Sequence, residues 1–213
     1  MLNSKKVLFV LAHYDDESFS GGTIKKMVDK GIEVSVLFIC GLGINLEDKR
    51  RDACWENSKL IGFTPYDLRY FDLTLNSLHN DVRIEMEQSV RDYIFSFAPD
   101  TVITNHGGDL HSDHRFVSKM VRIITRPSQH HNIKNLYECY VPGAAEYGDG
   151  TQMFNTVIDI TSEFREKIKC LANYNLSTNG VSNLNGAEIS SKYFGNLYGV
   201  GVAEIFKPIY CKG

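Results

Sequence analysis

Two apolar runs near the N-terminus constrain the fold more than any other feature of the chain. Val7–Ala12 (VLFVLA) and Glu33–Cys40 (EVSVLFIC) consist mainly of apolar and β-branched residues, which is typical of strands covered on both faces. Between them, Gly22–Lys30 has apolar residues at helical spacing, and Gly31 follows it as a helix C-cap would. Strand, helix and strand in this order predict a βαβ unit.

The alternation of strands and helices continues along the chain. Further helices are predicted at Arg50–Ile61, at Val82–Phe97, from Asp113 to the residue before Pro127, and from Glu163 to Tyr174. Further strands are predicted at Leu68–Phe71, Thr101–Thr104, Leu136–Val141, Thr156–Ile160 and Ala203–Ile209. This order predicts an α/β fold, with a Rossmann-like, doubly wound and mainly parallel sheet and helices on both faces. Because the 213 residues contain no linker rich in Pro, Gly or Ser, we expect one domain over residues 1–213.

The charge and the apolar pattern exclude several classes of protein. Lys and Arg number 23 against 26 Asp and Glu, a net charge of -3, so the composition does not favour nucleic acid as a partner. No apolar stretch reaches the length of about 20 residues that an integral membrane segment needs. The first apolar run is followed by acidic residues and not by a small-residue cleavage site, so we expect a cytoplasmic protein. The oligomeric state stays open, a homo-oligomer included.

The cysteines argue against disulfide or thiolate chemistry. The chain has 5 cysteines, an odd number, and they are widely scattered without a CxxC pair. A disulfide framework or a thiolate zinc site is therefore not expected. Cys40 and Cys170 lie in apolar or amphipathic stretches and are interpreted as buried thiols, with a cysteine nucleophile as the alternative.

Two polar motifs follow strands that should lie next to each other. His13-Tyr-Asp-Asp-Glu17 comes directly after the first strand, and a segment with three histidines and two aspartates, His106–His114, follows the strand Thr101–Thr104. In a doubly wound sheet these two strands are commonly neighbours where the winding direction reverses. We therefore expect the two motifs to face each other at one edge of the sheet.

The residue types in these motifs predict a metal site. Two imidazoles and one carboxylate with an open fourth position form a catalytic zinc site, and His13, Asp16 and His114 could supply them. The same set also suits Fe²⁺. The alternative is a solvated helix N-terminus for the acidic triplet, but the second motif favours the metal. The other histidines, His79, His130 and His131, are interpreted as ordinary core or surface residues.

These motifs resemble those of a known family. AHYDDE at Ala12–Glu17 resembles the AHPDDE motif of the PIG-L/LmbE-like zinc-dependent N-acetylglucosaminyl deacetylases, and DLHSDH at Asp109–His114 resembles their D-x-H-P-D-H motif. Near the C-terminus, Tyr193-Phe-Gly and Ala203-Glu-Ile-Phe206 resemble the family's closing helix with a glycine and its A-E-x-F ending. The resemblance implies a PIG-L/LmbE-like deacetylase domain.

The resemblance also implies an activity. That family removes an acetyl or related acyl group from the amide nitrogen of glucosamine-type sugars. By position, His13, Asp16 and His114 would bind zinc, and Asp15 would be the general base. In the family's mechanism zinc lowers the pKa of a bound water and polarises the amide carbonyl while the carboxylate takes the proton of the water.

Four further residues receive roles by the same resemblance. His111 would stabilise the oxyanion as an imidazolium, and Asp113 would orient His111. Arg50 is expected to bind the amino-sugar substrate, and Asp109 is expected to contact it as well.

Departures from the family pattern leave the substrate open. Tyr14 and Ser112 replace prolines, Ile44 stands where many members have a glutamate, and Tyr174–Ser177 does not reproduce an H-x-S-Q segment. An amidase acting on a sugar-thiol or a non-sugar amide, and a metal- or sugar-binding module without turnover, are the alternatives. A dinucleotide site and a serine hydrolase are not supported, since the chain has no GxGxxG after its first strand and no GxSxG.

Overall fold

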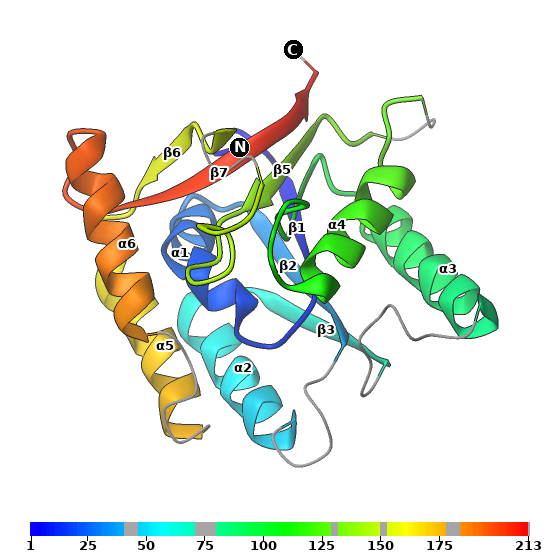
Figure 1. Cartoon of the computed structure of the whole chain (residues 1–213), viewed down its shortest axis with the longest axis horizontal. Helices are drawn as coiled ribbons and strands as arrows, with labels where there is room; N and C mark the ends of the chain where they lie inside the picture. Colours follow the sequence, from blue (N-terminus) through cyan, green and yellow to red (C-terminus); the bar gives the residue numbers. More distant parts are fainter. Residues whose placement is uncertain (41–46, 71–79, 129–131, 150–152, 178–183, 213) are drawn as a thin grey trace.

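The strands of the described residues form one seven-stranded sheet. The computed structural model describes all residues except 41–46, 71–79, 129–131, 150–152, 178–183 and 213. The strands are β1 (Lys6–Leu11), β2 (Glu33–Cys40), β3 (Thr64–Tyr70), β4 (Thr101–Thr104), β5 (Asn135–Cys139), β6 (Thr156–Asp159) and β7 (Ala203–Cys211). Their order is β3-β2-β1-β4-β5-β7-β6, and only β7 pairs antiparallel, with β5 and β6 (Figure 1). The prediction of a mainly parallel sheet is confirmed.

Helices cover both faces of this sheet, as predicted. They are η1 (Asp16–Ser20, a 3₁₀ helix), α1 (Gly21–Asp29), α2 (Glu47–Ile61), α3 (Asn80–Phe97), α4 (Ser112–Ile124), α5 (Phe164–Ser177) and α6 (Leu184–Leu197). The helices α3 and α4 lie on one side and α1, α2 and α5 on the other (Figure 1). In β1, the alternation of a strand sends Phe9 into the core beneath α1 and α2, and Val10 into the core beneath α3 and α4.

The winding direction reverses at β1. This strand pairs with β2 on one side and with β4 on the other, and Val10 lies opposite Thr104. The chain therefore leaves β1 and β4 at the same edge of the sheet, where open α/β sheets bind ligands. This topology brings the two polar motifs together.

Two elements differ from the prediction. The strand expected at Leu68–Phe71 begins earlier, at Thr64, and includes Pro65. A proline is tolerated there because β3 is the edge strand, where a missing backbone donor breaks no ladder. The glycine-containing helix expected near Tyr193 starts already at Leu184. Its Gly195 is required by packing, since a Cβ there would lie 2.5 Å from the carbonyl oxygen of Gly201.

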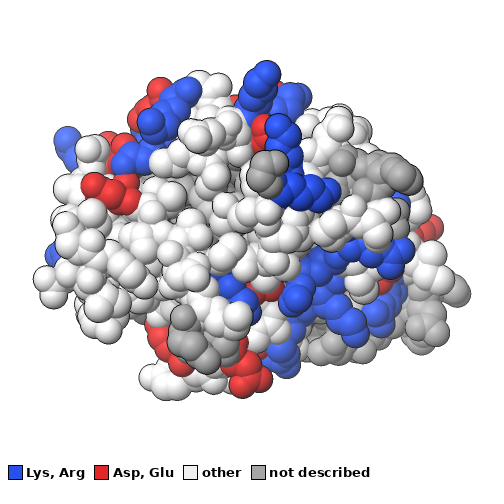
Figure 2. Space-filling view, turned by 90° about the horizontal axis from the view of Figure 1, so that it is seen from above, with Lys and Arg blue, Asp and Glu red and all other residues white. Residues whose placement is uncertain are grey.

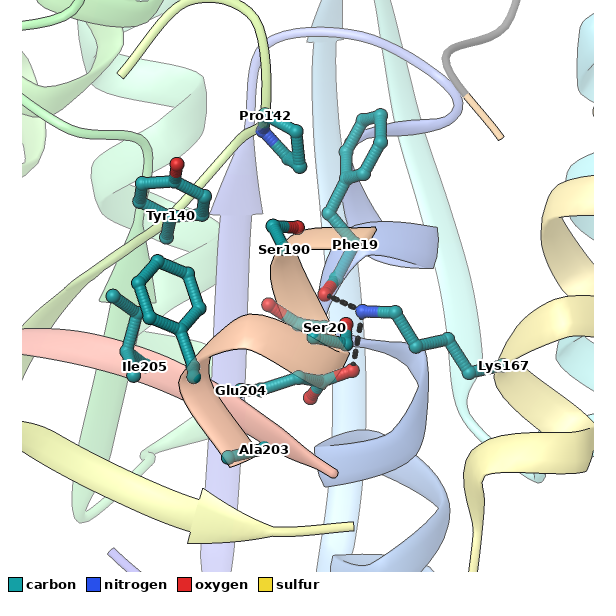
Figure 3. Close-up of a pocket in the computed structure, with 11 residues that line it drawn as sticks. Phe19, Ser20, Tyr140, Pro142, Lys167, Ser190, Ala203, Glu204 and Ile205 are labelled. Atoms are coloured by element: carbon teal, nitrogen blue, oxygen red, sulfur yellow. Dashed lines mark hydrogen bonds and ion pairs between the residues drawn. The ribbon is translucent and has the colours of Figure 1, made fainter. Parts of the chain in front are cut away.

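A buried ion pair attaches the motif that follows β1 to the C-terminal strand. Glu204 of β7 accepts hydrogen bonds from the backbone nitrogens of Gly22 (3.0 Å) and Thr23 (2.8 Å), so it caps α1. Lys167 of α5 donates from Nζ to Glu204 Oε1 (2.7 Å) and to the carbonyl oxygen of Phe19 in η1 (Figure 3). The A-E-x-F ending thus has a structural role in holding η1 and α1.

Two expectations about burial and membrane segments can be compared with the structure. Cys170 is buried with a free thiol, as predicted, while the side chain of Cys40 lies outside the described residues. None of the helices in the described ranges combines the length and the apolar character that a membrane span needs.

Candidate active site

Asn105 joins the two motifs at the edge of the sheet. It follows β4 directly, and its Oδ1 accepts a hydrogen bond from the backbone nitrogen of Ala12 (2.8 Å). Its Nδ2 donates to Asp16 Oδ2 (3.0 Å), which also accepts from the backbone nitrogen of His13 (3.1 Å). Asn105 was not among the predicted site residues, because an amide next to a histidine-rich segment has no sequence signal of its own.

The three predicted metal ligands lie together. Asp16 Oδ1 is 3.3 Å from His114 Nε2, and Asp16 Oδ2 is 3.9 Å from His13 Nδ1. Ligand atoms of a tetrahedral zinc site, bound at roughly 2.0–2.1 Å, lie about 3.3 Å from one another. Ring nitrogens of His13, His111 and His114 also lie within 4.8 Å of one another. The donor types and their separations fit a metal ion.

The charges at this cluster keep Asp16 ionised. Burial alone would raise the pKa of Asp16, but the neighbouring His114 and His13 and the donor Asn105 lower it below its usual range. Burial opposes the charge of His114, yet the carboxylates of Asp16 and Asp109 outweigh it and raise the pKa of His114 to about 10. An ionised carboxylate is the form that binds a cation.

Asp15 is held in a conformation that few residues adopt. Its φ is 103°, in the left-handed region. Its Oδ2 accepts a hydrogen bond from Arg50 Nη1 (2.9 Å), so the structure places Arg50 at the site as well. Burial raises the pKa of Asp15 to about 6, although Arg50 opposes the shift. A carboxyl with this pKa can take and release a proton near neutral pH.

Two hydrogen bonds connect the backbone of Asp15 to Glu17 and through it to Tyr174. Glu17 Oε2 accepts from the backbone nitrogen of Asp15 (3.0 Å), and Tyr174 of α5 donates from its hydroxyl to Glu17 Oε1 (2.5 Å). Burial raises the pKa of Glu17 to about 8, against the hydrogen bond from Tyr174. Asp16 and Glu17 are both buried, so the alternative of a solvated acidic triplet is wrong.

We expect Tyr174→Phe to lower kcat on the order of tenfold, with KM unchanged, because the support of Asp15 loosens. The lost hydrogen bond also costs about 1–3 kcal/mol of unfolding free energy. Tyr210→Phe is the matched control, since its hydroxyl donates to the carbonyl of Thr125 at 2.5 Å, near the opposite edge of the sheet. If both variants lose the same fraction of kcat, Tyr174 has only a structural role.

Asp109 and Asp113 both contact histidines of the site. Asp113 Oδ2 lies 3.1 Å from His13 Nε2, and the backbone nitrogen of Asp113 donates to His111 Nδ1 (3.2 Å). Asp109 Oδ2 lies 2.9 Å from His114 Nδ1, and its Oδ1 accepts from the backbone nitrogen of His111 (2.7 Å). Asp109 is buried and positions His114. Its contact with substrate, and the orienting of His111 by the Asp113 carboxylate, stay predictions.

His106, the first histidine of the second motif, has a different environment from the metal-ligand cluster. Its Nδ1 lies 2.7 Å from Glu138 Oε2, and its Nε2 lies 2.7 Å from the carbonyl oxygen of Asp149. Glu138 Oε1 also accepts from Ser118 Oγ (2.8 Å). These contacts join β4, β5 and α4 to the segment that contains Asp149.

We expect Glu138→Gln to cost about 2 kcal/mol of unfolding free energy at pH 7. Burial would raise the pKa of Glu138, but the bonds from His106 and Ser118 outweigh it and lower the pKa below 4.5. The Glu138 carboxylate thus stabilises the folded protein fully above its ordinary pKa of 4.5, and this stabilisation is lost as the pH falls through the lower pKa of the folded state. Urea unfolding at pH 7 and pH 4 checks this, with the exposed Glu56→Gln as control. A cost that stays constant with pH contradicts it.

A family comparison matches the part of the chain that holds both motifs. The family model described as "PIG-L: GlcNAc-PI de-N-acetylase" matches residues 8–125. The chain belongs to the PIG-L family. The resemblance expected from the AHYDDE and DLHSDH segments is therefore confirmed.

Solved structures similar to this PIG-L chain share its fold. The N,N'-diacetylchitobiose deacetylase of Pyrococcus horikoshii has a TM-score of 0.77 at 20% identity, over 98% of this chain and 85% of that one. A deacetylase of teicoplanin biosynthesis has a TM-score of 0.72 at 15% identity, over 95% and 97%. The 4-carboxy-2-hydroxymuconate hydratase of Pseudomonas putida KT2440 has 0.72 at 15%, over 98% of each chain. No curated protein matches the chain. Identities this low show the fold alone.

The departures from the PIG-L motifs have local explanations where the structure describes them. Tyr14, in place of proline, is buried and packs its ring on Phe38 and Trp55, with centroid distances of 5.0 and 6.2 Å. Ser112, in place of the second proline, begins α4. The segment with Ile44, and also His79, His130 and His131, lie outside the described residues.

Proposed function

We propose that this PIG-L protein is a metal-dependent hydrolase that removes the N-acetyl or a related N-acyl group from an N-acetylglucosamine-type amino sugar or its conjugate. One observation supports this most: a carboxylate with a raised pKa, Asp15, lies next to the cluster of His13, Asp16 and His114 in the sequence and in the fold. A base beside a metal site is what the hydrolysis of an amide requires.

His13, Asp16 and His114 would hold the metal. Zn²⁺ is the ion we favour, and Fe²⁺ is also compatible with two imidazoles and a carboxylate. When bound, the metal would act as a Lewis acid toward the amide carbonyl and lower the pKa of the attacking water. Asp109 positions the ring of His114 through Nδ1, which leaves Nε2 toward Asp16.

Asp15 would carry the proton through the reaction. Its carboxylate takes a proton from the water as the water oxygen bonds to the amide carbon. It then passes the proton to the nitrogen as the C–N bond breaks, which yields a carboxylate and the free amine. Arg50 Nη1 donates to Oδ2 of Asp15, which leaves Oδ1 to take the proton.

His111 would stabilise the oxyanion as a neutral ring, and not as the imidazolium that the resemblance implies. Burial, together with His114 and His13, lowers the pKa of His111. Its Nδ1 accepts the backbone hydrogen of Asp113, so the proton of the neutral ring is on Nε2 and can be donated to the substrate oxygen. This tautomer favours a catalytic role for His111 over a role as a metal ligand.

The substrate class rests on the family and on the similar deacetylases. The sugar-thiol amide, the non-sugar amide and the binding module without turnover remain alternatives. Hydration of a double bond is a further alternative, because a hydratase has a similar fold and the fold alone does not determine the reaction. The cytoplasmic location, the single domain and a homo-oligomer also remain predictions.

Metal analysis of purified protein tests the metal part of this proposal. We expect about one zinc or iron per chain in the wild type and in Asp15→Asn. His13→Ala should lose most of this metal, because His13 is one of the proposed protein ligands. Equal metal content in His13→Ala and the wild type would exclude this ligand set.

A further inference from the structure

The exposed face of α4 and the residues just after it carry four basic side chains. Arg115, Lys119 and Arg122 follow one another at helical spacing and lie on the same face of the helix, and Arg126 comes two residues after the helix ends at Ile124. They line a groove of about 510 Å³, here called the α4 groove, together with Gly107, Ser118 and Ile123. Figure 2 shows basic side chains gathered on this side of the molecule. None of these lining residues is acidic, although the chain as a whole has a net charge of -3.

The positive charge of the α4 groove is only partly offset by the protein. Arg122 Nη1 lies 3.7 Å from Glu138 Oε1, but Glu138 is fully buried and also lies 3.6 Å from Lys207 Nζ. Arg115 Nη1 donates to the carbonyl oxygens of Asp109 (2.6 Å) and Leu110 (2.5 Å), which are neutral acceptors. The groove therefore offers the guanidinium of Arg115 and the ammonium of Lys119 to an anion from outside.

The chemistry of these side chains favours an oxyanion such as phosphate. Guanidinium groups present paired donors that match the oxygens of phosphate, and arginine is the residue that proteins use most for this purpose. A volume of about 510 Å³ lies in the range of small-molecule sites. We propose that the α4 groove binds a phosphate-bearing ligand through Lys119 and the three arginines.

The α4 groove adjoins the segment that positions the candidate metal ligands. Arg115 contacts the groove and also the backbone of Asp109, whose carboxylate holds His114. A ligand in the groove would thus touch the outer side of that segment. The binding proposal itself is independent of the proposed deacetylase activity, because it rests on the basic side chains that line the groove.

Calorimetric titration of the metal-loaded protein with inorganic pyrophosphate tests the proposal. We expect saturable binding of one ligand per chain, weakened at least about tenfold in the double variant Lys119→Gln/Arg126→Gln. The control Lys59→Gln/Lys192→Gln removes the same charge from two exposed lysines on other helices and should bind as the wild type does. A co-sedimentation arm uses vesicles of phosphatidylcholine with and without phosphatidylglycerol, so that a free phosphate and a lipid headgroup can be distinguished.

Four outcomes are possible, and each decides the proposal. Loss of pyrophosphate or phosphatidylglycerol binding in the α4 variant alone supports it and identifies the source of the phosphate. Equal weakening in both double variants indicates a general charge effect and overturns it. Binding that is unchanged in both places the anion elsewhere, for example at the metal cluster, and also overturns it. Absence of binding to both probes in the wild type overturns it as well.

Discussion

Asp15→Asn protein will bind metal as the wild type does and release amine about 1000-fold more slowly, since a positioned base contributes about 10²–10⁴ in rate. The amide keeps the shape of the carboxylate and can still accept the hydrogen bond from Arg50. Asparagine also tolerates the left-handed conformation that residue 15 adopts, with φ of 103°. The variant therefore removes the base and leaves the backbone of the site in place.

The comparison requires proof that the fold and the metal are retained. The metal content of Asp15→Asn should match that of the wild type, and its urea unfolding should show one cooperative transition as the wild type does. Arg50→Lys is a useful companion, since it keeps a charge near Asp15 but loses the planar donor group. Rapid turnover by metal-loaded Asp15→Asn would show that another group acts as the base.

Lys167→Met is expected to destabilise the protein by about 3 kcal/mol, because it leaves the carboxylate of Glu204 buried without its cation. The side chains of Lys167 and Glu204 are only 2% and 4% exposed. The backbone nitrogens of Gly22 and Thr23 still donate hydrogen bonds to Glu204 in the variant. The lost unfolding free energy should therefore lie at the lower end of the range measured for broken buried ion pairs. Equilibrium urea unfolding at pH 7 measures the change.

Lys25→Met is the matched control on α1. Lys25 pairs with Asp29, and the two side chains are 25% and 52% exposed, so water already screens the pair and its loss should cost less than about 1 kcal/mol. The double variant Lys167→Met/Glu204→Gln should recover part of the loss, since no charge stays buried. A cost for Lys167→Met as small as that of Lys25→Met would contradict the structural role of the ion pair.

The sequence predicts most of the sheet but not its antiparallel end. Continuous apolar runs such as Val7–Ala12 are typical of strands buried on both faces, and their alternation with helices indicates the parallel order. The direction of β7 is not encoded in its own residues. It depends on how α6 returns the chain to β5, which is a tertiary property.

At the candidate site, the sequence identifies the candidate metal ligands better than the residues that hold them in place. His13, Asp16 and His114 stand out because their types and positions suit a metal, and the fold brings them together. Asn105 and Tyr174 act only through hydrogen bonds with partners far along the chain. Neither has a pattern that predicts its partner, and the raised pKa of Glu17 follows from a burial that the sequence does not reveal.

The most direct test of the central claim is amine release by metal-loaded wild-type protein from N-acetylglucosamine, its glycosides and its conjugates. We predict release of one amine for each carboxylate formed, abolished on removal of the metal and slowed about 1000-fold in Asp15→Asn. Silence on a broad panel of N-acyl amino sugars, by protein shown to hold its metal, would contradict the account. Hydration of an unsaturated acid by the same preparation would then favour the reaction class of the similar hydratase.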